Sequence, residues 1–202
     1  MKVHSVDFEL DKRGRILDAA AQLIVQNGLE SPMSAIAARA GVATGSLYNY
    51  FKSKNEMIAA VYARLADEIA DAIVAEIDRS LSHRERLMRY VNAYIDFFWA
   101  DPGRAILFEY LANVPLIPPT QLGPVFDRVT QYGQTLIIEA KADGALKNMD
   151  PALMGAMIGG GIRNCLKWRR IEPRPLSDDE RRQIAELCWN AIAASPSSFI
   201  DS

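Results

Sequence analysis

Residues 44–54 carry hydrogen-bonding side chains at a spacing that suits contact with a nucleic acid duplex. An asparagine amide pairs with an adenine edge through two hydrogen bonds, while tyrosine hydroxyls and lysine ammonium groups bind phosphate oxygens. We therefore predict that Thr44 and Asn49, with Ser34 from the preceding helix, read base edges. The predicted phosphate contacts are Tyr48, Tyr50 and Lys54.

Two short predicted helices, 32–40 and 44–50, position these side chains. Helices this short, joined by a turn of about three or four residues, must cross steeply and share a small core. Gly41 begins the turn, where a positive φ is required, and Ala37 is small enough for the second helix to pass closely over it. The predicted inner face consists of Ile36, Ala40, Val42 and Leu47.

The outer face of the second helix is neutral, and Gly45 and Ser46 keep its first turn small. Such a face can enter the major groove of DNA and bring backbone amides to a phosphate, as in a helix-turn-helix. An alternative is that Tyr48 and Tyr50 are ordinary surface aromatics and that Lys54 is merely solvated. However, Lys54 begins a helix, where a cation is poorly placed for the helix dipole, so a phosphate opposite it explains it better.

The charge distribution agrees with this interpretation. The chain has 202 residues, half of them hydrophobic, and a net charge of −2. These values are typical of a folded protein and do not by themselves indicate nucleic acid. Residues 12–54 contain six basic and two acidic side chains, a local net charge of +4. A basic segment beside an acidic remainder fits a module that approaches an anion, although on charge alone solvated surface charge is the more common explanation.

These motifs resemble the DNA-binding signature of the TetR family of bacterial regulators. The similar segments are Ile-Ala-x-x-Ala-Gly-Val at 36–42, Gly-Ser-Leu-Tyr-Asn-Tyr-Phe at 45–51 and Ser-Lys-Asn-Glu at 53–56. The motif resemblance covers residues 12–62, and beyond it only the number and length of the helices agree. Tyr50 stands where many members carry histidine, and Pro32 stands where threonine is common.

The resemblance implies an all-α protein of about nine helices. Residues 1–53 would form the helix-turn-helix DNA-binding domain, and residues 54–202 would form the ligand-binding and dimerisation domain. It also implies a homodimer that binds a palindromic double-stranded DNA operator. Repression, relieved by a small-molecule effector, is the usual outcome in the family.

Helix start and stop signals recur along the chain. Ser53, Ser82 and Ser177 are each followed three residues later by Glu, which predicts capping boxes. Ser31, Asp101 and Asp150 each precede a proline, a pattern typical of a helix start. Glycines at 28, 41 and 144 can end helices in the left-handed conformation. Apolar periodicity then predicts helices at 12–27, 32–40, 44–50, 54–79, 83–100, 102–113, 121–142, 151–170 and 178–194.

Aromatic side chains and one amide suggest a ligand pocket in residues 54–202. Met157, Gly161, Asn164 and Trp168 share one face of a predicted helix, which leaves Asn164 as a polar group on an apolar stripe. A buried amide needs a partner, either a ligand or a neighbouring backbone carbonyl. Aromatic residues at helical spacing more often belong to the core than to a ligand site. The candidate pocket residues are Tyr94, Phe98, Tyr110, Tyr132, Asn164 and Trp168. We expect a mainly apolar effector, since this region supplies few candidates for buried charges.

The last two predicted helices are the candidate dimer interface. Glycines on one face of helix 151–170 would form a flat surface for a neighbouring helix, and the terminal helix could complete a four-helix interface. The predicted interface residues are Gly155, Gly159, Ile162, Leu166, Leu187 and Ile192.

The sequence offers no catalytic or metal-binding motif. His4 and His83 have no nearby metal-ligand partners, and neither a Gly-x-Ser-x-Gly nor an HExxH motif occurs. We therefore expect no enzymatic activity, cofactor or metal. Cys165 and Cys188 share no metal-ligand spacing and are expected to be free buried thiols. The N-terminal residues lack the apolar core of a signal peptide, and the most apolar stretch is too short to span a bilayer, so we expect a cytoplasmic protein.

Two alternatives remain open at this point. The chain could be a helical enzyme or small-molecule-binding protein without a DNA role, which would require a polar catalytic cluster in residues 54–202. It could also be an activator of the same fold.

Overall fold

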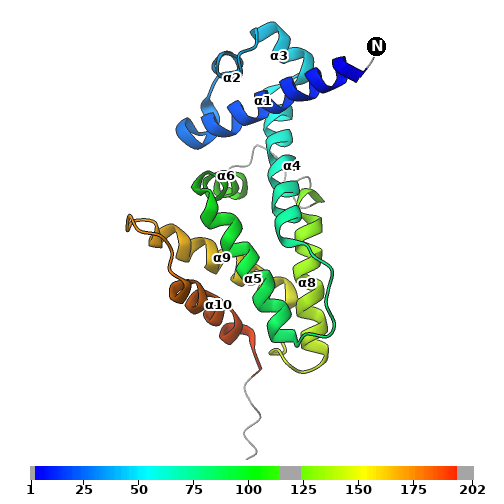
Figure 1. The fold of residues 1–202 in the computed structure, drawn as a ribbon, viewed down its shortest axis with the longest axis vertical. Coiled ribbons are helices and arrows are strands. Elements are labelled where there is room, and N and C mark those ends of the chain that lie inside the picture. The colour runs from blue at the N-terminus through cyan, green and yellow to red at the C-terminus, as the bar shows by residue number, and fades with distance from the viewer. Residues whose placement is uncertain (1–2, 114–123, 195–202) are drawn as a thin grey trace, which may run out of the picture. The chain divides into compact units, whose positions relative to one another are not determined.

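The structure is a computed structural model that describes residues 3–113 and 124–194 (Figure 1). The described ranges contain nine α-helices and one 3-10 helix, which confirms the predicted all-α class. None of these helices is long and apolar enough to cross a membrane. The elements are α1 (Val3–Asn27), η1 (Gly28–Glu30), α2 (Met33–Ala40), α3 (Thr44–Tyr50), α4 (Lys54–Ile73), α5 (His83–Ala100), α6 (Pro102–Asn113), α8 (Asp127–Ala142), α9 (Pro151–Arg169) and α10 (Asp178–Ile192).

The chain forms two compact units. The first contains α1, η1, α2, α3, most of α4 and α6, and the second contains the end of α4 with α5, α8, α9 and α10. In the first unit, the apolar side of α1 is buried, with Ile16 and Ala20 fully inaccessible to solvent. Arg64 of α4 forms an ion pair of 2.7 Å with Asp18 of α1. Tyr110 of α6 lies over Gly28, where a Cβ atom would approach its hydroxyl to 3.6 Å.

Helix α5 is the central element of the second unit, and α8, α9 and α10 all pack against it (Figure 1). Two tyrosines one turn apart on α5 point at glycines of its neighbours. A Cβ atom at Gly133 of α8 would lie 3.0 Å from the Tyr90 hydroxyl, and one at Gly159 of α9 would lie 3.3 Å from the Tyr94 hydroxyl. Tyr94 also accepts a hydrogen bond from Arg163. These glycines let large buried side chains fit between closely packed helices.

Most of the predicted helix starts are correct. Complete capping boxes precede α5 at Ser82 and α10 at Ser177, and Asp150 accepts a hydrogen bond of 2.8 Å from the Ala152 amide. At Ser53 the box is incomplete, because Glu56 reaches back to the Lys52 amide instead of the Ser53 amide. The prediction that Ser31 caps the second helix is wrong. Ser31 is buried, and its hydroxyl donates to the carbonyls of Leu23 and Gly28.

Two predicted boundaries differ from the structure. Helix α1 begins at Val3 rather than at residue 12. The earlier start was not predicted because the first turns of the helix lack the apolar periodicity that marks a helix in sequence. Helix α4 ends at Ile73 rather than at residue 79. Asp78 accepts hydrogen bonds from both the amide and the hydroxyl of Ser80, a local pairing that competes with helical hydrogen bonds. Of the predicted helix 121–142, residues 121–123 lie outside the described part of the chain.

Replacement of Gly133 with alanine should destabilise the protein through Tyr90. The new methyl group would overlap the Tyr90 hydroxyl, so we expect Gly133→Ala to lower the free energy of unfolding by about 1–3 kcal/mol. Urea denaturation followed by circular dichroism measures this loss. Tyr90→Phe removes the overlapping oxygen, so the double variant should lose less than the sum of the two single losses. Strictly additive losses would contradict the proposed contact.

Candidate functional site

Helices α2 and α3 form a compact helix-turn-helix with a buried interior. Ile36, Ala37 and Leu47 are each at most 1% exposed. Gly41 ends α2 with a φ of 67°, as the sequence predicts, and the following Val42 amide donates to the Ala37 carbonyl over 3.0 Å. The left-handed glycine turns the chain sharply enough for α3 to begin three residues later. Val42, predicted to be part of the interior, is only half-buried.

The opposite face of the helix-turn-helix carries the predicted DNA-binding residues. Six of them are exposed, and they are Ser34, Thr44, Gly45, Ser46, Tyr48 and Asn49. Tyr50 and Lys54 are half-buried, and Lys54 is the first residue of α4, as expected. The buried Leu47 and the exposed Asn49 lie on the same short helix, which therefore has one side in the core and the other in solvent.

A surface hollow of about 590 Å³ adjoins this face and includes a residue that the sequence analysis missed. Lys12 of α1 lines it together with Ser46, Asn49 and Tyr50. A cation here adds a second positive charge near the outer face, where an anionic backbone would lie. Lys12 was counted in the basic segment, but no periodicity or motif joins it to a helix that begins 32 residues later in the chain.

Other basic residues of the segment stabilise the fold. The Arg13 guanidinium lies over the Phe51 ring, 5.2 Å from its centroid, and Arg15 donates to the Ala40 carbonyl over 3.4 Å. These contacts connect α1 with the end of α2 and the end of α3. The local positive charge thus has two roles, because part of it holds the helices together and part lies at the outer face.

The predicted pocket residues of the second unit do not share the cavity of that unit described below, which only Tyr132 of this set lines. Tyr94 and Phe98 pack against each other in the core, with ring centroids 4.8 Å apart. Tyr110 belongs to the first unit, whereas the other candidates belong to the second. Asn164 and Trp168 are exposed, so the prediction of a buried amide at Asn164 is wrong.

The two faces of α9 are the reverse of those predicted. Ile162 and Leu166 are at most 1% exposed, and Ile192 of α10 is also buried, so these three side chains belong to the core and not to an interface. Gly155 and Gly159 also face the interior, toward Ile137 and Tyr94 respectively. Of the six predicted interface residues, only Leu187 has an exposed side chain. The physical reason is that α9 is apolar on both sides, so its periodicity does not distinguish them.

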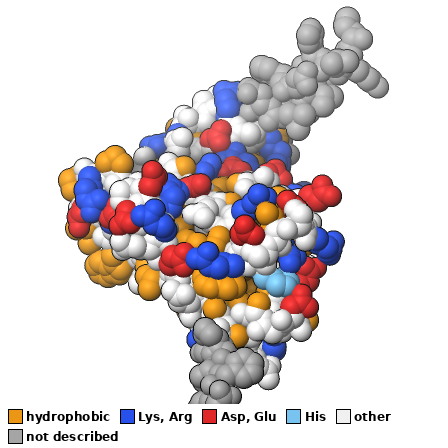
Figure 2. Space-filling view, turned by 60° about the horizontal axis from the view of Figure 1, so that its bottom comes forward, with side chains coloured by type: hydrophobic (Ala, Val, Ile, Leu, Met, Phe, Trp, Pro, Cys, Tyr) orange, Lys and Arg blue, Asp and Glu red, His pale blue; other side chains and the backbone are white. Residues whose placement is uncertain are grey.

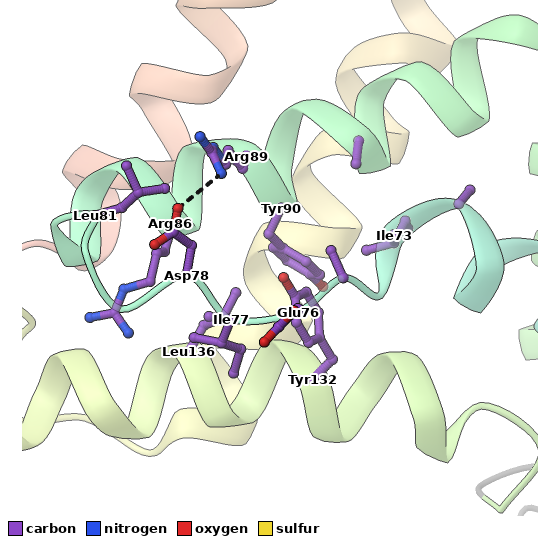
Figure 3. A pocket seen from close by; sticks show the side chains of 13 residues that line it. Ile73, Glu76, Ile77, Asp78, Leu81, Arg86, Arg89, Tyr90, Tyr132 and Leu136 are labelled. Carbon is purple, nitrogen blue, oxygen red and sulfur yellow. Dashed lines mark ion pairs between the residues drawn. The ribbon is translucent and has the colours of Figure 1, made fainter.

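A cavity of about 180 Å³ lies between the end of α4, the segment that follows it, α5 and α8 (Figure 3). Tyr132 is the one predicted pocket residue that lines it. Tyr90, Glu76 and Arg86 are further lining residues that the sequence analysis did not select. The sequence analysis missed these residues because it did not predict the early end of α4. A helix continuing to residue 79 would carry Glu76 on a regular helical surface, whereas in the structure Glu76 lies on an irregular segment.

The described residues contain no cluster of three or more His, Cys, Asp or Glu side chains able to hold a metal ion. Both cysteines are free, but only Cys188 is buried, and the exposed Cys165 corrects the expectation for that residue. Burial raises the pKa of the Cys188 thiol to about 11, which keeps it protonated at neutral pH.

Comparisons with known proteins identify the helix-turn-helix. Residues 16–61 match the family described as bacterial regulatory proteins, tetR family. The chain is 35% identical over 101 residues to the transcriptional activator FasR of Mycolicibacterium smegmatis, a match that covers 49% of this chain and 46% of FasR. It is 24% identical over 183 residues to the regulator YhgD of Bacillus subtilis, covering 89% of this chain and 95% of YhgD.

The similarity extends to the complete fold. A crystal structure of a tetR family transcription regulator from Shewanella sp. PV-4 superposes with a TM-score of 0.82 and 26% identity, covering 91% of this chain and 99% of the other. The family match of residues 16–61 and the structural similarity over 91% of the chain both point to tetR family regulators. Residues 16–61 therefore carry the DNA-binding helix-turn-helix of the tetR family, and the described chain shares the fold of a tetR family transcription regulator.

Proposed function

We propose that the chain is a homodimeric repressor that leaves its operator when a small, mainly apolar effector binds. The observation that carries the DNA-binding part is α3, which has a buried inner side and a polar, hydrogen-bonding outer side. Residues 1–53 bind DNA in this proposal, and residues 54–202 bind the effector and the second protomer. Two copies would then reach half-sites of a palindrome about 34–36 Å apart, or a multiple of that distance.

The proposed contacts divide into two classes. Tyr48, Tyr50 and Lys54 contact phosphates, while Thr44, Asn49 and Ser34 contact base edges. Phosphate contacts carry no sequence information, so their loss weakens binding to every duplex. Base contacts discriminate between sequences, and a bidentate pair contributes about 1–3 kcal/mol to that discrimination.

Lys54→Ala and Asn49→Ala should therefore have different effects. We expect Lys54→Ala to weaken binding to the operator and to random DNA alike, and to reduce the slope of log K against log salt by about one per subunit. Asn49→Ala should weaken operator binding by about 5- to 150-fold and leave binding to random DNA unchanged. The measurement is a salt titration by fluorescence anisotropy, with an operator obtained by selection from random duplexes.

Lys141→Ala provides the matched control, because it removes a cation from α8 in the second unit. It should alter neither affinity nor salt slope. If Lys54→Ala and Asn49→Ala behave alike, the division between phosphate and base contacts is wrong. If neither changes DNA binding, α3 is not the recognition helix.

Relatives support an effector of apolar character. The fatty acid regulator FadR of Bacillus subtilis, whose fold superposes with a TM-score of 0.73 at 22% identity, was crystallised with stearoyl-CoA. KstR of Rhodococcus jostii, 41% identical over 66 residues, is named a repressor. Activation is the alternative outcome, because FasR is named an activator. In either case an effector acts by binding one conformation better than the other.

The outward faces of α9 and α10 are the proposed dimer surface, in place of the buried residues selected from the sequence. Figure 2 shows hydrophobic side chains at the surface in several patches, separated by charged groups. Contiguous apolar surface on helices is typical of interfaces between protomers. The exposed apolar side chains of these helices and of the segment that follows α9 are Leu153, Met157, Trp168, Ile171 and Leu187, which are 42–70% exposed.

A charge on this surface should dissociate the dimer. We expect Leu187→Asp and Leu153→Asp each to shift the protein from dimer to monomer at micromolar concentration, because each buries an unpaired carboxylate in the interface. Sedimentation velocity measures the shift. Ile138→Asp is the control, since Ile138 is an equally exposed apolar residue on α8. A wild-type monomer, or dissociation by Ile138→Asp alone, would contradict the proposed surface.

A further inference from the structure

We propose that the effector carries one positively charged amine or quaternary ammonium group, bound in the cavity beside α5 by Glu76, Tyr90 and Tyr132. The effector role of this cation rests on the proposed function, whereas the binding site stands by itself. The rest of such a ligand is apolar, in keeping with the apolar character proposed above.

The size of the cavity suits a head group rather than a complete drug-sized molecule. Its volume is about 180 Å³, whereas sites that enclose a drug-sized ligand usually measure about 300–1,000 Å³. Ile73, Ile77 and Leu136 supply apolar walls. In Figure 3, Glu76, Tyr90 and Tyr132 lie at one end of the cavity, and Leu81 and the arginines lie toward the other.

The charges around the cavity leave one carboxylate for a ligand. Arg89 pairs with Asp78 at 3.9 Å, shown by the dashed line in Figure 3. Hydrogen bonds from Ser80 lower the pKa of Asp78, so this carboxylate remains ionised in the pair. Arg86 donates to Glu139, outside the lining, over 2.8 Å.

Arg86 also donates to His83 Nδ1 over 2.9 Å, so both terminal nitrogens of its guanidinium are engaged away from the tyrosines, while its buried Nε has no partner among the described residues. Among the described residues that line the cavity, Glu76 is the charged side chain with no ion pair or hydrogen bond to another described residue. An ammonium group would neutralise it, whereas an anionic head group would add a second negative charge beside it.

The two tyrosines next to Glu76 provide the other half of a cation site. The rings of Tyr90 and Tyr132 lie 6.1 Å apart at an angle of 55°, so they form two sides of a corner. Aromatic faces attract ammonium groups by about 0.5–2 kcal/mol, most strongly where water is excluded. Tyr90 is 8% exposed, and burial raises the pKa of its hydroxyl, so the ring stays neutral and Glu76 supplies the negative charge that no arginine of the lining neutralises.

Gly133 fixes the position of this corner. It lies on the same helix as Tyr132, and a Cβ atom at this position would lie 3.0 Å from the Tyr90 hydroxyl, so the glycine allows α5 and α8 to approach closely enough for the two ring centroids to lie 6.1 Å apart. The site thus joins an aromatic corner to a carboxylate on the irregular segment after α4.

Three ligands with the same alkyl chain and different head groups test the proposal. Isothermal titration calorimetry would compare hexyltrimethylammonium, hexanol and hexanoate on the complete chain. We expect the cation to bind about tenfold more tightly than hexanol, and hexanoate to bind most weakly. Equal or tighter binding of hexanoate would overturn the proposal.

Glu76→Gln keeps the shape of the side chain and removes its charge. It should reduce the affinity for hexyltrimethylammonium about tenfold and leave the affinity for hexanol unchanged. Tyr132→Ala should weaken the cation further by removing one aromatic face. The matched control is Glu30→Gln, which removes an exposed carboxylate from η1 in the first unit and should have no effect. An unchanged affinity in Glu76→Gln would also overturn the site.

Operator binding separates this site from the proposed function. If the cation binds in a Glu76-dependent manner and also releases the operator, both proposals are supported. If it binds but leaves operator affinity unchanged, the site stands and its role as an effector site fails. If stearoyl-CoA releases the operator while the cation does not bind, the regulatory function stands and the cation site is wrong.

Discussion

The recognition surface depends on the burial of one side of α3. A helix of seven residues does not persist in water by itself, because helix nucleation is unfavourable and few hydrogen bonds repay it. Leu47, which has no exposed surface, and Phe51, at its C-terminal end, attach α3 to the interior of the first unit. Because α3 is attached in this way, its outer side chains are also held in defined positions. Arg13 and Arg15 add contacts from α1, so the same interior that stabilises the unit also fixes the geometry of the DNA-binding face.

In the second unit, the other helices depend in a similar way on α5. Here the constraint is the volume of the α5 side chains. Its aromatic side chains are large, and three helices pack around it. Because the glycines on α8 and α9 have no side chain, they leave room for the tyrosine hydroxyls of α5. The helices can therefore pack tightly without leaving large voids. The cavity lies beside the irregular segment between α4 and α5, where helix no longer packs against helix. The proposed ligand site thus lies at an irregular segment supported by helices.

Local signals in the sequence predicted much of this structure. The capping boxes at Ser82 and Ser177 and the turn at Gly41 depend on a few neighbouring residues, and these features occur as expected. Features that depend on distant residues were not predictable in the same way. Lys12 reaches the outer face only through the packing of α1, and Glu76 lines a cavity only because α4 ends early.

Helix α9 shows a different limit of sequence analysis. Ile162 on one side and Leu153 on the other are both aliphatic, yet one is fully buried and the other is 63% exposed. Both sides of α9 carry aliphatic residues at helical spacing, so composition and spacing cannot reveal which side faces α5. The direction is set by the fit of Gly159 against Tyr94, a contact between helices far apart in the sequence.

The exposed side of α9 also links the stability of the chain to its abundance. Leu153, Trp168 and Ile171 remain largely in water in a single protomer. If a second protomer covers them, the folded state gains free energy that grows with the logarithm of protein concentration, whereas the unfolded state gains none. A cell that produces little of this protein would then hold chains that are individually less stable, and synthesis rate would itself set how many survive proteolysis.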